Sequence, residues 1–483
     1  MGTINSAFNL ITSALDADQS ALDIVANNVA NANTTGYTRE VPNFEETSPI
    51  QINGVQYGTG VTQTGPVSVR DSVLEQRLAQ QQQLAASSGS ELGALNTLQA
   101  LFTPDSGSSG ATAGDIGSDL TTFFSSFSAL EANPTDSALR QQVLAAATTL
   151  AGDVSNAADS LNSQRTALDQ EAAGVTSQVN SLTSAIAQLN RQIQSNSPAT
   201  DAGTLEDQRV QDISQLSQSI GINQVTTENN GLSITTTSGQ LLVSQAASFQ
   251  LTTGQVNGVT DFFVNGTDVT AQLTTGGGSL GGFLTARDQD IPNALSSLDQ
   301  LAYSVSTQVN ALNNAGTNLN GVEGTGTNAA GVTGTGTTPL YIFNEPTQVA
   351  GSAAALSVIT TDPSQIAAAG FGDGTGDDSN AVALANLANQ GIVNGQSPTG
   401  YYSQFVSQLG STVLRVQTDN TAQNASVTQL QTQVNALSGV NLNDEASSLQ
   451  QYERAYQAAS EVFTILDTVI SSALNLGVQT AVS

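Results

Sequence analysis

Few side chains in this sequence could do chemistry, because it contains no histidine, no cysteine and no lysine. That composition excludes a Ser-His-Asp triad, a thiol nucleophile, a zinc or iron–sulfur site built on His or Cys, and any disulfide. Carboxylates, Tyr, Ser, Thr and Arg are what remain. Clusters of carboxylates are therefore the first candidates for a functional site.

The densest acidic cluster is formed by Asp373, Asp377 and Asp378 in the run GDGTGDDSN. Its composition is that of a calcium loop, but it lacks the alternating ligand positions and the closing Glu of an EF-hand. A helix N-cap explains the cluster better, with Asp378 or Ser379 starting the next helix. We predict no metal site here.

Two pairs, Asp16/Asp18 and Asp288/Asp290, have the residue types of a glycosidase acid and base. The first pair lies on or beside an apolar helical stripe, and the second precedes Pro292, where negative charge suits the start of a helix. The Gly-rich runs lack the Lys-Ser/Thr of a phosphate loop. The sequence therefore predicts no enzyme, no metal and no cofactor.

The net charge limits the partners. Forty acidic residues against ten basic ones give a formal charge of −30. Such a chain offers no basic surface to nucleic acid and is repelled by anionic lipid, so neither is an expected partner. It has no run of about 18 apolar residues that would span a membrane, and its first residues have no basic region followed by an apolar run, as a secretory signal would.

Both ends of the chain carry apolar residues at heptad spacing. The N-terminal stripe consists of Ile4, Phe8, Ile11, Leu15, Leu22, Val25 and Val29, and the C-terminal stripe of Leu449, Tyr452, Tyr456, Phe463, Leu466 and Ile470. A lone helix cannot keep such a stripe in water, so we expect the two helices to pack as a coiled coil and these side chains to form an assembly interface. The alternative is that each helix packs separately on a globular body.

Between the ends the pattern predicts an elongated helical bundle. Helices are expected from about Asp71 to Leu101, around Leu120–Leu130 with a core of Phe, and from Leu150 to Ile193, the last being roughly 65 Å long. Partners for the long helix are residues 295–312 and 401–437. This length suits a rod better than a compact enzyme.

Residues 220–284 change character, since Thr- and Val-rich alternating segments are separated by Asn-Gly turns. We predict a mainly α fold with an inserted, outer antiparallel β domain. The predicted domains are residues 1–50 with 440–483 (terminal coiled coil), 70–215 with 286–439 (helical bundle), and 216–285 (β domain). Residues 316–340 have no core-forming pattern and are expected to be an exposed, mobile loop.

The run NNVANANTTGY that follows the first helix predicts a capped turn, because Asn33 and Gly36 tolerate left-handed backbone. This run resembles the signature of bacterial flagellar axial proteins, and the segments 277–316 and 439–477 are similar to the flagellar hook-associated protein 1 family. The residues that carry the resemblance are Asn27, Asn28, Asn31, Asn33, Gly36 and Tyr37, with Arg287, Asp288, Ile291 and Pro292.

The resemblance implies a structural subunit that forms the junction between flagellar hook and filament. It also implies self-assembly into a ring, contacts with the hook protein and with a second junction protein on the filament side, and a cytoplasmic export chaperone. The protein would be extracellular, exported by the flagellar type III route without a cleaved signal. Another axial protein (hook, rod or flagellin-like), a secreted translocator and an extracellular enzyme are the alternatives.

Overall fold

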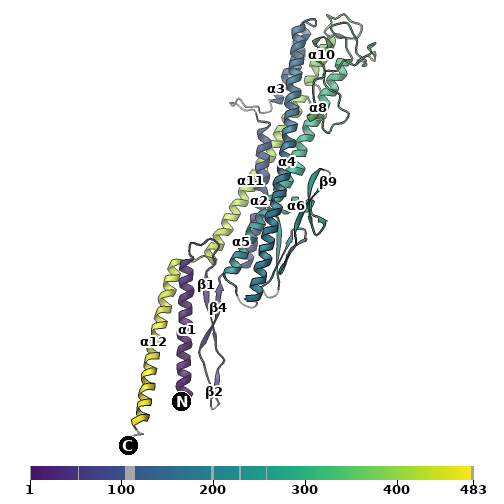
Figure 1. The fold of residues 1–483 in the computed structure, drawn as a ribbon. Coiled ribbons are helices and arrows are strands. Elements are labelled where there is room, and N and C mark those ends of the chain that lie inside the picture. Colours follow the sequence, from purple (N-terminus) through teal and green to yellow (C-terminus); the bar gives the residue numbers. More distant parts are fainter. Residues whose placement is uncertain are drawn as a thin grey trace.

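The computed structural model of this protein describes residues 2–52, 54–103, 115–196, 201–227, 230–256 and 258–479. The molecule is long: both termini lie at one end, beside a β ribbon, and a rod of helices with small sheets on one flank extends away from them (Figure 1). This agrees with the predicted fold class, mainly α with an inserted β domain.

The first and last helices pack along each other. Helix α1 spans Gly2–Ala30 and α12 spans Leu442–Gln479, and the rings of Phe8 and Phe463 lie 4.8 Å apart. Of the two arrangements open to the terminal helices, direct pairing is therefore the one observed.

The Pro, Gly and Thr content of residues 42–66 predicts a linker, but the segment after α1 forms a β ribbon. Strand β1 (Glu40–Glu46) pairs with β4 (Val61–Ser68), and β2 (Ile50–Ile52) pairs with β3 (Val55–Tyr57). Alternating Val, Ile, Thr and Tyr favour strands. Gly54 in the intervening turn has φ +81°, which only glycine adopts readily.

The rod consists mainly of helices α2 (Ser72–Ala100), α3 (Ile116–Ala132), α4 (Ser137–Asn196), α5 (Thr204–Ser219), α8 (Ile291–Asn314) and α11 (Pro398–Ser438). Every predicted helix is present. Helix α4 begins earlier than expected, where Asp136 accepts the Ala138 N–H at 2.7 Å, and its 60 residues extend about 90 Å. No helix of the described residues is both long and apolar enough to cross a membrane.

The predicted Phe core is confirmed. Phe123, Phe124 and Phe127 of α3 are fully buried, and Phe123 packs edge-to-face on Phe343 from the loops beyond α8. Arg140 is also fully buried and donates to the carbonyl oxygens of Pro134 and Ile366. The upper end of the rod is thus closed by packing and by one internal cation.

The inserted β region forms two small antiparallel sheets. Strands β5 (Ile222–Thr226), β6 (Leu232–Thr236), β7 (Leu241–Ser244) and β8 (Ala247–Ser248) make one sheet, and β9 (Leu251–Val256), β10 (Val259–Val264) and β11 (Thr267–Asp268) make the other. The strand pattern was predicted too far along the chain. Residues after β11 form helices α6 (Thr270–Gly276) and α7 (Gly278–Thr285), whose Leu273, Leu280 and Leu284 are buried under the sheets.

The segment after α8 is largely exposed over residues 319–339, as expected, and Asn side chains of α8 hold the parts that lead into and out of it. Asn310 Oδ1 accepts the N–H groups of Ile342 and Phe343, both at 3.0 Å, and Asn313 Nδ2 donates to Leu340 O at 2.7 Å. Short helices α9 (Ser352–Ala355) and α10 (Ser379–Asn386) and two 3₁₀ turns, Pro363–Gln365 and Leu387–Asn389, follow. Buried amides therefore anchor this segment beside its buried apolar side chains, among them Ile342, Phe343 and Ile366.

Several buried carboxyl groups in the rod bind protons more readily than usual. Burial, with Asp290 nearby, raises the pKa of Glu91 to about 7, and burial with Asp153 nearby raises the pKa of Asp119 to about 7. Burial also raises the pKa of Asp290 to about 6. The folded protein is therefore most stable at a pH where these carboxyl groups are protonated.

We expect the melting temperature of the rod to be higher at pH 5 than at pH 8. A carboxyl group whose pKa is raised by folding contributes its full stability below its unfolded pKa of about 4, and the contribution is lost as the pH rises through 7. Thermal unfolding followed by circular dichroism measures this. Asp119→Asn should flatten the pH dependence, whereas Thr122→Ala, a neutral change at an exposed position of the same helix, should leave it unchanged; equal slopes in both variants would contradict the assignment.

Candidate assembly interface

The seam between α1 and α12 contains most of the predicted side chains. Val25 is buried. Half-buried in the same region are Phe8, Ile11, Leu15, Leu22, Leu449, Tyr452, Phe463, Leu466 and Ile470. The side chain of Ile4 lies outside the described part of the chain.

Two predicted members lie outside the seam. Val29 is 45% exposed and Tyr456 is 37% exposed. The residues just before them are less exposed: Asn28 is buried and Ala455 is half-buried. A straight α-helix drifts by about 20° per heptad relative to a 3.5-residue repeat, so Val29, at the end of its stripe, turns away from the contact line.

Asn28 ties the two chain ends together at the top of the seam. Its Nδ2 donates to Glu40 O at 2.8 Å and to Glu445 Oε2 at 3.1 Å. Its Oδ1 accepts the Glu40 N–H at 3.0 Å and the Tyr37 hydroxyl at 2.9 Å. All four hydrogen bonds that an amide can make are thus present on a side chain that is 1% exposed.

Glu445, buried at the start of α12, also pairs with Arg39 at 2.8 Å. The Arg39 backbone N–H donates to Ser438 O at the end of α11, and its C=O accepts the Val69 N–H. One arginine therefore links the ribbon, α11 and α12. We call the group Asn28, Tyr37, Arg39, Glu40 and Glu445 the joint.

A second set of charges fastens the joint to the rod. Arg70, just before α2, lies 2.9 Å from Asp207 of α5, and Asp207 also accepts the Thr38 N–H at 3.0 Å. Burial, with the nearby carboxylates Asp201 and Asp207, raises the pKa of Glu40. The joint is therefore a place where burial and like charge oppose ionisation.

The other residues of the N-terminal motif shape the turn. Asn31 Nδ2 donates to Asn27 O and Oδ1 at the end of α1, and Gly36 has φ +80°. A Cβ on Gly36 would lie 1.9 Å from Gln211 Nε2. Asn33 is exposed and does not adopt a left-handed backbone, so of the two expected residues Gly36 alone uses that conformation.

The central motif fixes the β region to the rod. Arg287 is 1% exposed and donates to Asp169 of α4 at 2.5 Å, to Thr260 O of β10 at 2.7 Å and to Asp288 at 2.8 Å. It lies in a π-helical turn, Ala286–Asp290, which inserts an extra residue before Pro292. Ile291 beside it is fully buried.

That π turn corrects the expected role of Asp288 and Asp290. Helix α7, the π turn and α8 run on without a break, since Asp290 has helical φ −69° and ψ −49°. No helix N-terminus exists there for the carboxylates to stabilise. Asp288 instead pairs with Arg287, and Asp290 carries a buried oxygen without a hydrogen-bond partner.

At the acidic cluster, α10 begins at Ser379, as predicted. The carboxylate that caps it belongs to Asp377, which accepts from Ser379 N–H, Ser379 Oγ and Gly370 N–H. Asp378 makes no side-chain cap bond. Within the described residues no group of three acidic side chains is placed to hold a metal ion.

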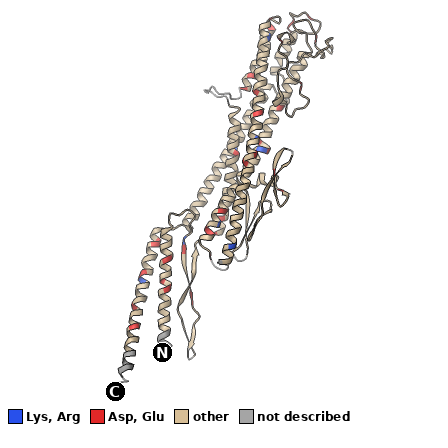
Figure 2. Ribbon diagram, viewed as in Figure 1, with Lys and Arg blue, Asp and Glu red and all other residues tan. Residues whose placement is uncertain are grey.

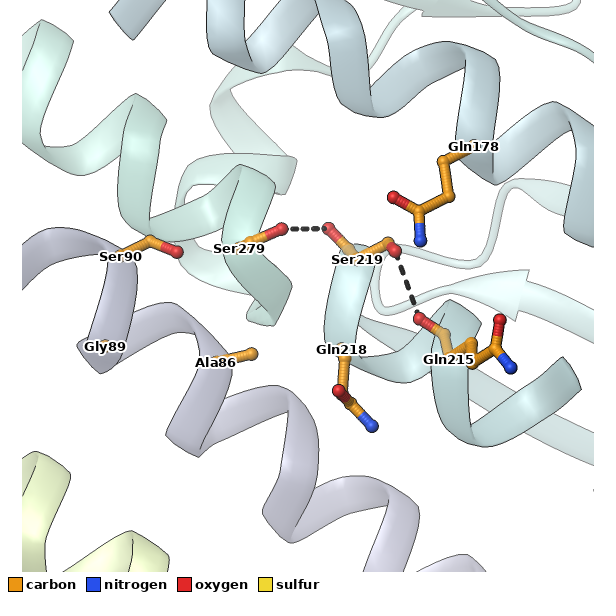
Figure 3. A pocket seen from close by; sticks show the side chains of 8 residues that line it. All are labelled: Ala86, Gly89, Ser90, Gln178, Gln215, Gln218, Ser219 and Ser279. Carbon is orange, nitrogen blue, oxygen red and sulfur yellow. Dashed lines mark hydrogen bonds between the residues drawn. The ribbon is translucent and has the colours of Figure 1, made fainter. Parts of the chain in front are cut away.

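Two cavities lie among the described residues, and the smaller one holds no activated nucleophile. One of about 450 Å³ is lined by neutral side chains, and Figure 3 shows Ser219 Oγ directed at Gln215 O and Ser279 Oγ at Ser219 O. Both hydroxyl protons are thus given to backbone carbonyls, with no base among the lining residues to activate them. A larger cavity of about 1240 Å³ opens beside the turn at Gly36, where Arg70 and Arg209 face Glu75 and Glu206.

Residues 105–328 match the family described as the flagellar hook-associated protein FlgK helical domain, and residues 8–38 match the flagella basal body rod proteins. The chain is 24% identical to flagellar hook-associated protein 1 of Escherichia coli K12, over 98% of this chain and 100% of that one. It is 27% identical to that of Bacillus subtilis 168, over 96% of each. The chain is thus similar to the flagellar hook-associated protein 1 family over nearly its whole length.

A solved structure has the same fold. It is that of the flagellar hook junction protein FlgK from Burkholderia pseudomallei, with a TM-score of 0.61 and 20% identity, covering 74% of this chain and 99% of that one. The motif at the end of α1 lies inside the segment shared with rod proteins, and Arg287 lies inside the segment specific to hook-associated proteins. The N-terminal motif therefore reflects similarity to rod proteins, and the Arg287 motif reflects similarity to hook-associated proteins.

We expect Asn28→Ala to loosen the start of α12. The change leaves the Glu40 N–H and a Glu445 carboxylate oxygen without a buried partner, which costs about 2 kcal/mol of local stability. Hydrogen exchange of the backbone amides at 445–452 measures the effect. Asn31→Ala, which removes only side-chain bonds to Asn27 and Thr34 around the end of α1, should change exchange there by less than about 0.5 kcal/mol; equal effects of the two changes would contradict a special role for Asn28.

Proposed function

We propose that this chain is a structural subunit of the junction between flagellar hook and filament, held in its assembly by packing of its terminal helices. The family is one of structural flagellar proteins, which supports the proposal. The match of residues 8–38 to rod proteins favours a terminal part common to axial subunits and keeps another axial protein as the second candidate.

The observation that carries the proposal is a second apolar stripe on α12. Val462 is 46% exposed, Ile465 62% and Val469 51%, and they follow one another at spacings of three and four. This stripe lies about 100° around the helix from the Leu466 seam. Since α1 already occupies the seam, the second stripe is free to bury against another copy.

The joint gives that packing a mechanical consequence. Its hydrogen bonds and ion pair connect the two terminal helices to each other and to the ribbon, and the neighbouring Thr38 is bonded to Asp207 of the rod. A subunit whose helices are held by its neighbours therefore has its rod held as well. The rods would form a second shell around a tube of terminal helices, with the β domain outside.

The remaining assignments rest on the family. The ring would contact the hook protein on one side and the second junction protein on the other, and an export chaperone in the cytoplasm would hold the C-terminal region before secretion to the extracellular flagellum. Antibody labelling of isolated flagella tests the location. A label along the hook or along the rod of the flagellum would favour the second candidate, another axial protein.

Ile465→Asp should abolish assembly and leave the monomer folded. The change places a carboxylate in the middle of the second stripe, where burial against a neighbouring copy would leave it unpaired. Pelleting of polymer and motility of cells that carry the variant measure assembly. Thr464→Asp is the matched control, because it adds the same charge one residue away, on the polar face of α12; normal assembly of both variants would contradict the proposal.

Assembly should also depend on salt. Helices α1 and α12 carry eight carboxylates against one arginine, and Figure 2 shows acidic residues along both helices and along the rod. Like charges brought together repel through a Debye length of about 10 Å at 0.1 M salt and about 3 Å at 1 M. Polymer yield should therefore rise with salt concentration, and a yield that stays constant would show that charge repulsion is unimportant.

A further inference from the structure

The segment after α8 contains a tandem repeat of ten residues. Residues 317–326 read TNLNGVEGTG and residues 327–336 read TNAAGVTGTG, which agree at seven of ten positions. The segment lies beyond the end of α8, at the end of the rod far from the termini (Figure 1). Neither the seam nor the joint uses it.

Both repeats fold in the same way. Asn318 Oδ1 accepts the N–H groups of residues 320 and 322, and Asn328 Oδ1 accepts those of residues 330 and 332, all at 2.9 to 3.0 Å. Gly321 and Gly331 have φ +74° and +80°. Each repeat thus forms a separate turn of chain that its own Asn side chain holds. We call residues 317–326 the inner rung and residues 327–336 the outer rung.

The rungs stack through their Gly-Thr-Gly ends. Gly324 and Gly326 donate inward to Gly316 O at 3.0 Å and Asn314 O at 2.9 Å. In the same way Gly334 donates to Gly326 O at 3.0 Å and Gly336 to Gly324 O at 3.3 Å. The stack is directional, because each glycine gives its N–H to the rung beneath and offers its C=O to the rung above.

Close approach explains why glycine occupies these positions. A Cβ on Gly334 would lie 2.1 Å from Gly324 O, and one on Gly336 would lie 1.9 Å from Glu323 O. Any segment that docks on such an edge in the same manner must therefore also have glycine at alternate positions.

The outer rung leaves this edge open. Gly334 O and Gly336 O accept no hydrogen bond from the described residues, whereas the equivalent Gly324 O and Gly326 O are both paired. Thr317 is buried at 4% exposure, and Thr327, at the same place in the outer rung, is exposed. The edge carries acceptors only, so the same edge of a second copy cannot pair with it.

Exposed valines mark the side-chain register. Val322 is 48% exposed and Val332 is 50% exposed, and each precedes its Gly-Thr-Gly by the same two positions. A further rung would extend this row with an apolar residue of its own.

We propose that the outer rung is a docking edge for an extended segment of a partner protein with the pattern Val-x-Gly-x-Gly. Its two glycine N–H groups would donate to Gly334 O and Gly336 O, and its apolar residue would lie against Val332. This is strand addition, in which backbone bonds supply affinity and alternate side chains supply specificity. The pattern of the partner segment is taken from the outer rung itself, which binds to the inner rung in this way.

A labelled peptide of sequence TNAAGVTGTG, added to the full-length protein, tests the proposal by fluorescence anisotropy. We expect saturable binding below about 1 mM, the range of weak specific complexes. The same peptide with alanine in place of the glycines of its Gly-Thr-Gly should not bind. Equal binding of both peptides, or no saturation by the first, would overturn the proposal.

Two protein variants locate the binding. Val332→Asp keeps an exposed position exposed but removes the apolar contact, and should weaken binding at least about tenfold. Val225→Asp, at a position 54% exposed on β5, should leave binding unchanged. A loss of binding in both variants, or in neither, would place the peptide elsewhere and refute the assigned edge. Circular dichroism of both variants checks that the rod is intact.

Discussion

One buried amide governs how this molecule is arranged. Asn28 satisfies all four of its hydrogen bonds with groups from the turn, the ribbon and the last helix, and so brings residues 28 and 445 together across more than 400 residues of chain. A buried donor or acceptor without a partner costs free energy, so the loss of any one of these hydrogen bonds destabilises the whole group. The direction in which the terminal helices leave the rod follows from it.

The chain has only ten cationic side chains, and several of these arginines connect separate parts of the fold. Arg39 and Arg70 hold the joint, Arg140 closes the far end of the rod, and Arg287 joins the β region to α4. Because these positive charges are engaged internally, the carboxylates that remain outside are poorly balanced. An acidic exterior with apolar stripes suits a subunit that stays apart in dilute solution and joins its neighbours when the stripes are buried.

Local patterns predicted well wherever a periodic apolar face met its expected partner. The Phe face of α3, the start of α2 near Asp71 and the strands β5 to β7 follow from spacing and turn residues alone. Among the predictions that were wrong are the helix start at Asp288 and Asp290, where α7 runs through a π turn into α8, and the strands expected up to residue 284, where α6 and α7 form instead. At α10 the N-cap position is Asp378, as predicted, but the neighbouring Asp377 makes the cap bonds. A sequence window does not show whether the preceding segment is already helical or which of two adjacent carboxylates points at the helix end.

The long helices, the inserted strands, the tendency of both ends to pair and the absence of His, Cys and Lys chemistry could be predicted from the sequence, because they depend on composition and on spacing within one segment. The contacts of Asn28 and Arg39 with Glu445, the pairing of Arg287 with Asp169 and the stacking of the glycine repeats with one edge open appear only in the folded molecule. Those contacts join residues far apart in the chain, and a hydrogen bond depends on positions within a few tenths of an ångström that no local pattern specifies.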